Sequence, residues 1–234
     1  MIVYMDWGRR TEAEVRTAAG LPLWVLTVGD GVFARRRGAR LLDGLWARGA
    51  RHCICRDAAL EALAGAAGLR PVPVLPLRLA LLERLLAVRC PGGLAERAAV
   101  LRCGRGGEET ARRALEVLAR RARCVRLDME RPEALAEELL YRWGVAEGDG
   151  GRPVAVTVVC GEAAWPEAGP VVDLTEACGA RQALVWTSPR AEGLPVPVGE
   201  ALAAALTDTG KWKISDIHIT DLLDIRRESY YNAT

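Results

Sequence analysis

The chain has 234 residues, half of them hydrophobic and 26% charged, which is typical of a globular protein with a substantial core. A formal net charge of +2 gives little overall attraction to nucleic acid or to an acidic membrane, so neither partner is expected. No apolar run reaches the roughly 20 residues that span a bilayer, and residues 1–10 lack the pattern of a signal peptide, so a cytoplasmic location is expected.

The first half of the chain alternates short apolar runs with longer amphipathic stretches that end at glycine or proline. This pattern predicts strands alternating with helices. The expected strands cover residues 2–5, 23–28 and 51–56, the first of them at a sheet edge, and 71–75 is expected as a short strand or an extended segment. The expected helices cover 11–19, 34–47, 58–67 and 77–87. Pro91, Gly92 and Gly93 then mark a domain boundary.

The second half continues the alternation, and its strands are more apolar. The run 153–160 is almost continuously apolar, as expected of a central parallel strand. The expected strands cover residues 98–103, 124–129, 153–160, 171–174 and 182–187, and the expected helices cover 108–122, 132–143 and 197–206.

These elements predict an α/β fold with two lobes rich in βα units. The N-terminal α/β lobe is expected over 1–93. A Rossmann-like lobe, a parallel sheet with helices on both faces, is expected over 94–206. Ligands of such sheets bind beyond the carboxyl ends of the strands.

The tail, residues 207–234, differs in composition from the rest. It holds both lysines, the only asparagine and four of the six isoleucines. A foreign origin of the segment is the favoured explanation, and an appended helix over about 221–231 is the alternative. The tail is therefore set aside when function is considered.

A glycine turn joins the strand at 98–103 to the following helix. Gly104, Gly106 and Gly107 lack side chains, which lets backbone N–H groups approach a pyrophosphate. A helix that begins at Glu108 would point its positive end at that phosphate, and the small Ala111 would let it pack close to the strand. The motif predicts a dinucleotide-binding turn, with a purely structural turn as the alternative.

The pattern Gly-x-Gly-Gly-x-x-x-Ala, its helix, and the segments 133–139 and 171–174 resemble the cofactor domain of the shikimate/quinate dehydrogenase family. The resemblance covers roughly residues 97–184. It implies a Rossmann-type fold in which Gly104, Gly106 and Gly107 bind the pyrophosphate of NAD(P).

The chain departs from that family in its catalytic inventory. The family's substrate domain depends on a lysine and on neighbouring asparagine and aspartate residues, whereas residues 1–210 contain no lysine and no asparagine. The usual catalysis is therefore excluded, and no catalytic residue is assigned. Glu108 and Glu109 also place negative charge where phosphates would sit, although carboxylates suit a helix start on their own account.

An acid at the end of the second strand indicates which cofactor to expect. Asp128 lies about 24 residues after Gly104, near the spacing at which an acid binds a ribose 2′-hydroxyl. This favours NAD over NADP. The leading hypothesis is an NAD(P)-binding protein, a divergent oxidoreductase with a dinucleotide and a small-molecule substrate as partners. The alternative is a non-catalytic scaffold or regulatory protein that kept the fold and lost the cofactor.

Other residues that could carry chemistry have simpler structural explanations. The seven cysteines are expected to be reduced and buried, and His52, Cys53 and Cys55 lack the spacing of a metal clamp, so no metal site is expected.

Asp30 could bind a substrate hydroxyl or a metal, but a local turn is favoured. The arginine run 35–37 with Arg40 could hold a phosphate, but such a run is more often a solvated helix face. Asp6 and Asp173 follow or end strands without a specific motif.

Overall fold

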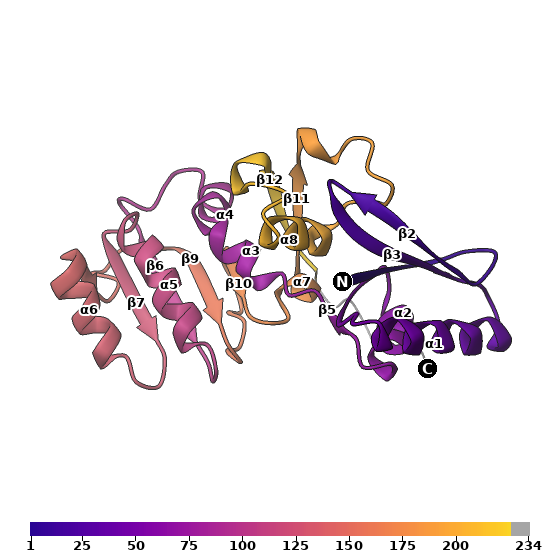
Figure 1. Ribbon diagram of the computed structural model, residues 1–234. Helices are drawn as coiled ribbons and strands as arrows, with labels where there is room; N and C mark the ends of the chain where they lie inside the picture. Colours follow the sequence, from indigo (N-terminus) through magenta and orange to yellow (C-terminus); the bar gives the residue numbers. More distant parts are fainter. Residues whose placement is uncertain (226–234) are drawn as a thin grey trace, which may run out of the picture. The chain divides into compact units, whose positions relative to one another are not determined.

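The computed structural model describes residues 1–225, which divide into two compact units. Unit 1 comprises Met1–Pro73 and Ser188–Asp216, and unit 2 comprises Val74–Thr187 and the segment that begins at Ile217. Each unit contains a sheet on which helices pack (Figure 1), and the predicted α/β class with two lobes is confirmed.

Unit 1 is built on a five-stranded sheet with the order β2-β3-β1-β4-β5, in which only β2 runs antiparallel to its neighbour. Its strands are β1 (Ile2–Trp7), β2 (Glu12–Ala18), β3 (Leu21–Val28), β4 (His52–Cys55) and β5 (Arg70–Pro71). Its α-helices are α1 (Val32–Ala47), α2 (Ala58–Ala66) and α8 (Glu200–Asp208), with short 3₁₀ turns at Pro189–Ala191 and Ile214–Asp216. Val3 and Met5 of β1, Leu42 of α1 and Leu60 of α2 belong to one buried cluster, so α1 and α2 cover the sheet through this core.

Two sequence-based expectations for unit 1 are wrong. The segment expected to be a helix at 11–19 is strand β2, because Ala19 (φ 49°) and Gly20 (φ 82°) make a two-residue turn that returns the chain along β3. The hairpin ladder supplies backbone hydrogen bonds, which outweigh the weak helix preference of this short segment. Strand β1 was expected at an edge but pairs with β3 on one side and β4 on the other.

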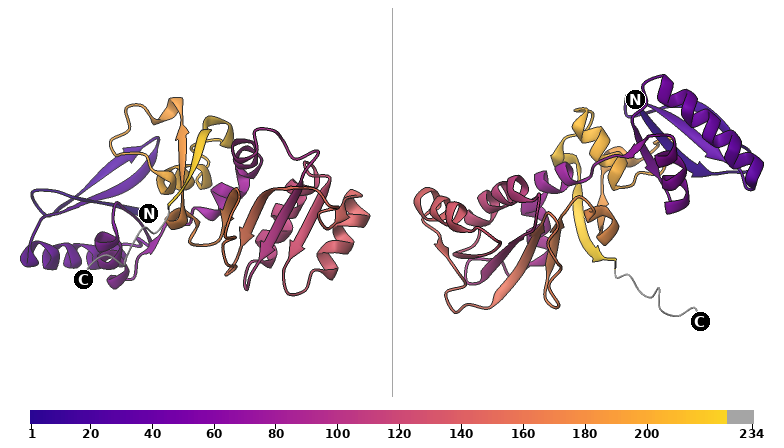
Figure 2. Two further views of the ribbon diagram at one scale, coloured as in Figure 1. Left: turned by 180° about the vertical axis from the view of Figure 1, so that it is seen from behind. Right: turned by 90° about the horizontal axis from the view of Figure 1, so that it is seen from below.

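Unit 2 is built on a five-stranded parallel sheet with the order β10-β9-β6-β7-β8. Its strands are β6 (Ala98–Cys103), β7 (Cys124–Asp128), β8 (Ala146–Glu147), β9 (Val154–Cys160) and β10 (Val171–Leu174). Its helices are α3 (Leu75–Ala80), α4 (Leu82–Arg89), α5 (Glu108–Ala119), α6 (Glu133–Trp143) and α7 (Cys178–Arg181). Figure 2 shows α5 and α6 on the same side of this sheet, as expected when two successive crossovers have the same hand.

The expected boundary at Gly93 falls within unit 2. Helices α3 and α4 precede that glycine, yet both pack against α5 and β10, so contacts assign them to the second sheet. The single helix expected at 77–87 is divided at Leu81, where the backbone leaves the helical conformation between α3 and α4.

The compositionally distinct tail is part of both units. Trp212 is buried in unit 1 and is 2% exposed, and Leu222 is buried in unit 2 at 1%. Residues 218–224 form β12 (His218–Asp224), which pairs antiparallel with β11 (Gln182–Thr187). The alternative of a helix at 221–231 is therefore wrong over 221–224, and its remainder from 226 lies outside the described residues.

Candidate functional site at the carboxyl end of the unit 2 sheet

The strand order of unit 2 reverses between β6 and β9. The chain proceeds from β6 outward to β7 and β8, and then returns to the other side of β6 to form β9 and β10. In chain order this is 5-4-1-2-3, the order of the first five strands of a dinucleotide-binding fold. Ligands of open α/β sheets bind at such a reversal, beyond the carboxyl ends of the strands, and the glycine turn follows β6 at this point.

The glycine turn is held by backbone hydrogen bonds to the neighbouring strand and to itself. Gly104 N donates to the carbonyl of Cys160 over 3.0 Å, and Gly107 N donates to the carbonyl of Gly104 over 3.2 Å. Helix α5 begins immediately afterwards, with Gly107 as its N-cap and no side chain capping its first amide groups. The positive end of a 12-residue helix therefore opens directly beside the turn.

The three glycines of the turn have different surroundings. A Cβ atom on Gly104 would lie 2.3 Å from the backbone nitrogen of Ala163, and one on Gly107 would lie 2.6 Å from that of Gly161. Gly106 has a positive φ of 74° and no heavy atom within 4 Å of its Cβ position. Two glycines thus admit a neighbouring backbone, while the middle one faces open space.

The segment 161–163, which follows β9, lies against the glycine turn. Glu162 N donates to the carbonyl of Arg105 over 3.1 Å, and Gly161, with φ of 62°, approaches the backbone of Gly104 and Gly107. The turns after β6 and β9 therefore meet at the strand reversal. This segment has no motif of its own in the sequence, and its one available signal is Gly161 directly after the apolar strand.

Asp128, the predicted ribose-binding acid, ends β7 at the same edge of the sheet. Its Oδ2 accepts a charge-assisted hydrogen bond from Nε of Arg102 over 2.7 Å, and its side chain remains 46% exposed. Arg102 lies opposite Asp128 in the strand register and also donates through Nη1 to the carbonyl of Ala164 over 3.2 Å. Arg102 is the residue of this site that sequence reasoning missed, because pairing between adjacent strands is not visible in the sequence.

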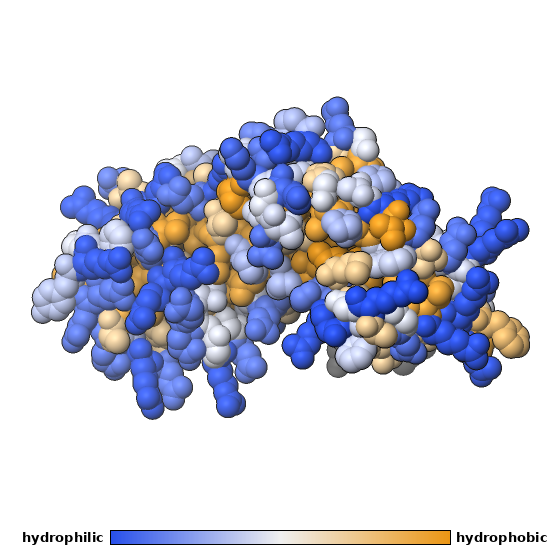
Figure 3. All heavy atoms as spheres, viewed as in Figure 1, coloured by the Kyte–Doolittle hydropathy of each residue, from blue (hydrophilic) through white to orange (hydrophobic). Residues whose placement is uncertain are grey.

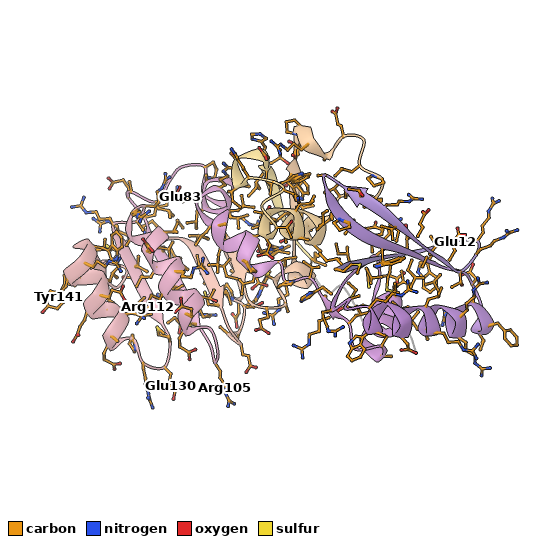
Figure 4. The ribbon with its side chains drawn as sticks, in the orientation of Figure 1. Glu12, Glu83, Arg105, Arg112, Glu130 and Tyr141 are labelled. Atoms are coloured by element: carbon orange, nitrogen blue, oxygen red, sulfur yellow. The ribbon has the colours of Figure 1, made fainter. Side chains whose placement is uncertain are left out.

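The remaining charges at this edge are exposed. Glu108 and Glu109 occupy the first turn of α5, and neither forms a side-chain cap there. In Figure 4, Arg105 of the glycine turn and Glu130, which follows β7, project from the same edge of unit 2. The site thus combines helix amides, one ion pair and exposed side chains of both signs.

The thiols beside the turn are unsuited to act as nucleophiles. Cys103 and Cys160 are partners in the register of β6 and β9, and both are buried. Burial raises the pKa of each thiol, and nearby Glu108 raises the pKa of Cys103 further. All seven cysteines are free thiols, as the sequence predicted.

The other candidate residues are dispersed. In unit 1, Asp6 pairs with Arg56 over 3.1 Å, and Asp30 is exposed just before α1. In unit 2, Asp173 is fully buried, and its Oδ1 accepts a hydrogen bond from Thr175 N over 3.0 Å. Within residues 1–225, no group of three His, Cys, Asp or Glu side chains could hold a metal ion. A shallow depression in unit 1, lined by Ala191, Leu194, Pro195, Val196, Pro197 and Val198, contains no titratable side chain.

The chain matches no protein family model and no curated protein. Among solved structures it is similar to the L-tryptophan dehydrogenase of Nostoc punctiforme, with 16% identity, a TM-score of 0.29, and coverage of 61% of this chain and 46% of that one. A putative aspartate carbamoyltransferase of Trypanosoma cruzi matches with 15% identity and a TM-score of 0.29, covering 74% of this chain and 70% of that one. The matched region spans less than half the length of the dehydrogenase, and at these scores neither likeness supports a functional inference.

No helix within residues 1–225 combines the length and the apolar character required to cross a membrane.

Proposed function

We propose that unit 2 binds a dinucleotide, NAD in preference to NADP, at the carboxyl end of its parallel sheet. The observation that carries the proposal is the placement of the glycine turn, which follows β6 at the strand reversal and leads directly into the uncapped end of α5. Backbone amides at such a helix end bind phosphate oxygens, because they are unsatisfied donors and the helix dipole favours negative charge.

The surroundings of the three glycines support this assignment. In a dinucleotide-binding turn, one glycine permits the tight bend, one lets the backbone approach the pyrophosphate, and one permits close helix packing. Gly104 and Gly107 meet neighbouring backbone, whereas Gly106 meets nothing within 4 Å. Gly106 is therefore the position at which the pyrophosphate would approach the chain.

Asp128 would accept a hydrogen bond from a ribose hydroxyl. It ends the strand next to β6, and its partly exposed carboxylate has capacity beyond its bond to Arg102. A 2′-phosphate would meet this carboxylate and be repelled, which favours NAD. The resemblance to shikimate-type dehydrogenases supports a cofactor of the NAD(P) class, but an oxidoreductase with this sequence needs chemistry other than a lysine-based step.

A second candidate function is a scaffold that retains the fold without the cofactor. The contact between residues 161–163 and the glycine turn favours it, because a loop that fills the strand reversal competes with a ligand for the same space. Glu108 and Glu109 favour it as well, since their charges repel phosphate.

Calorimetric titration of the full chain with NAD and NADP up to millimolar concentration separates the two functions. The informative variant is Gly106→Ala, which places a methyl group where the pyrophosphate would approach. Gly144→Ala is its matched control, because Gly144 has a similar φ of 64° and an equally open Cβ position. Gly144 follows the C-terminal end of α6, away from the glycine turn in the chain. Both substitutions carry the same cost of alanine in a left-handed conformation, about 1 kcal/mol.

The dinucleotide proposal expects NAD to bind the wild type and Gly144→Ala but to bind Gly106→Ala at least roughly tenfold more weakly, a loss of about 1.4 kcal/mol. An absence of heat with either cofactor in the wild type would leave the scaffold function. Equal binding by the two variants would place the cofactor elsewhere.

A further inference from the structure

One end of unit 1 brings two exposed segments together. The hydroxyl of Thr11 donates to the carbonyl of Ala34 over 3.2 Å and accepts from Gly29 N over 3.0 Å. These bonds fix the turn between β1 and β2 against the first turn of α1. Arg9 and Arg10 therefore lie at the same end of the unit as Val32 and Phe33.

Several exposed arginines lie at this end of unit 1. Arg9, Arg10, Arg36 and Arg37 are all exposed, and none forms an ion pair with another residue in the range 1–225. Arg35 lies over the ring of Trp7 at 5.6 Å. The nearby acids Asp30 and Glu12 are also exposed, and Glu12 is labelled in Figure 4. The local excess of positive charge is hidden by the net charge of +2 for the whole chain, which by itself predicts no anionic partner.

Two apolar side chains project among these arginines. Phe33, the only phenylalanine of the chain, is 85% exposed, and Val32 is 64% exposed. Figure 3 shows a small apolar protrusion at this end of α1, with hydrophilic side chains around it. Val32 and Phe33 are adjacent at the start of α1 and remain mostly exposed within unit 1, so they are available to contact a membrane or another molecule.

We propose that this end of unit 1, the arginine tip formed by Arg9, Arg10, Val32, Phe33, Arg36 and Arg37, docks on a bilayer that contains anionic phospholipid. The arginines would bind lipid phosphates, while Phe33 and Val32 would insert at the boundary between headgroups and acyl chains. Charge complementarity selects an anionic partner, and the paired aliphatic and aromatic side chains select a lipid surface. A nucleic acid would offer Phe33 a base to stack on but would offer Val32 no apolar volume.

Sedimentation of the full chain with vesicles tests this proposal. Vesicles of phosphatidylcholine alone are compared with vesicles that also contain phosphatidylglycerol, at low and high salt. Phe33→Ser removes the apolar contact, and its control is Tyr141→Ser, because Tyr141 of unit 2 is equally exposed at 85%. The triple variant Arg10→Gln, Arg36→Gln, Arg37→Gln removes the charge.

The control for the triple variant carries the same change of charge elsewhere. Arg113, Arg123 and Arg131 of unit 2 are exposed and form no ion pair within residues 1–225, so their replacement by glutamine matches the test variant. Solubility and the thermal midpoint of each variant are measured alongside, so that unfolding is distinguished from lost docking.

Docking predicts partition of the wild type onto phosphatidylglycerol vesicles, weakened by salt. The triple variant at the tip should lose on the order of 100-fold in partition, and Phe33→Ser roughly tenfold, with both controls unchanged. Equal partition onto phosphatidylcholine alone, or equal losses in the unit 2 controls, would overturn the proposal. Displacement of the protein from the vesicles by a duplex oligonucleotide at lower concentration than by free phosphatidylglycerol would overturn it too, in favour of a nucleic-acid surface.

Discussion

The guanidinium Nε of Arg102 lies 2.7 Å from Oδ2 of Asp128, so the acid at the end of β7 is paired with a cation of the neighbouring strand. Because Arg102 also bonds to the carbonyl of Ala164, one side chain connects the ends of β6 and β7 with the segment after β9. Any ligand hydroxyl that reaches Asp128 has to share the carboxylate with Arg102.

Replacing the acid should therefore change which cofactor binds. Asp128→Asn releases Arg102 and removes the charge that repels a 2′-phosphate, so the ratio of NADP to NAD affinity should rise at least roughly tenfold. Calorimetric titration with both cofactors measures the ratio. Asp149→Asn is the control. Asp149 pairs over 3.5 Å with Arg126, which lies in β7 as Asp128 does, and the Asp149 side chain is about as exposed as that of Asp128. If NAD still binds and the ratio is unchanged, Asp128 does not determine which cofactor is preferred.

Adding a methyl group at Gly104 should destabilise unit 2. The new Cβ would lie 2.3 Å from a backbone nitrogen and 2.4 Å from a backbone carbon of the segment 162–163, which cannot move aside as a side chain could. Gly104→Ala is expected to lower the free energy of unfolding by about 3 kcal/mol. Gly44→Ala, at an open exposed position within α1, should raise it by about 0.5–1 kcal/mol, because alanine favours a helix. Urea unfolding curves measure both changes, and equal effects would contradict the tight contact.

The N-cap of α2 should make unit 1 sensitive to acid. Leu60 N–H donates to Oδ1 of Asp57 over 2.9 Å and Nε1 of Trp7 donates to Oδ2, and these bonds lower the pKa of Asp57 below its ordinary value of 3.8. The stabilisation is present above that ordinary value and is lost as pH falls through the lowered pKa of the folded protein. Thermal unfolding between about pH 5 and pH 2 should show this loss.

Asp57→Asn separates the cap from its charge. Asparagine also caps helices well, so the variant should keep much of the stability near neutral pH while losing part of the acid dependence. Asp43→Asn in α1 is the control, since Asp43 has no hydrogen-bond or ion-pair partner within residues 1–225. A wild-type acid dependence that persists in Asp57→Asn would assign the effect to other carboxylates.

The buried tryptophan after α8 should be essential to the core of unit 1. Trp212 is 2% exposed, so Trp212→Ala should cost about 3–5 kcal/mol in the free energy of unfolding. Trp46→Ala removes the same side chain at 43% exposure and should cost markedly less. Chemical unfolding followed by circular dichroism compares them. A small effect at Trp212 would indicate that this side chain is not essential to the core of unit 1.

The sequence was sufficient for the central elements of unit 2, which are β6, β7, β9, β10, α5 and α6, because their signals are local. The apolar runs at 98–103 and 153–160, and the glycines that follow the first, correspond to β6, β9 and the turn between β6 and α5. The order of the strands in the sheet could not be predicted from these local signals. It depends on which side of β6 the later strands β9 and β10 pair.

The misassigned segments have a different physical origin. Residues 12–18 have acidic residues near their start and a glycine after their end, which mimic a helix, but the hairpin at Ala19 and Gly20 gives them a partner strand. Likewise, the pairing of Arg102 with Asp128 and the contact of Gly104 with the segment 162–163 join residues far apart in the chain. Such long-range relationships carry no periodic signal in one sequence.

The interleaved assignment of segments to the two units has a consequence for synthesis. Residues 188–216 complete unit 1, so this unit cannot reach its final packing until the ribosome has made nearly the whole chain. The sheet of unit 1 completes its packing only when α8 and Trp212 have been synthesised. The residues of the parallel sheet of unit 2 are synthesised before that point. Neither half can be expressed as one uninterrupted fragment with all its native contacts.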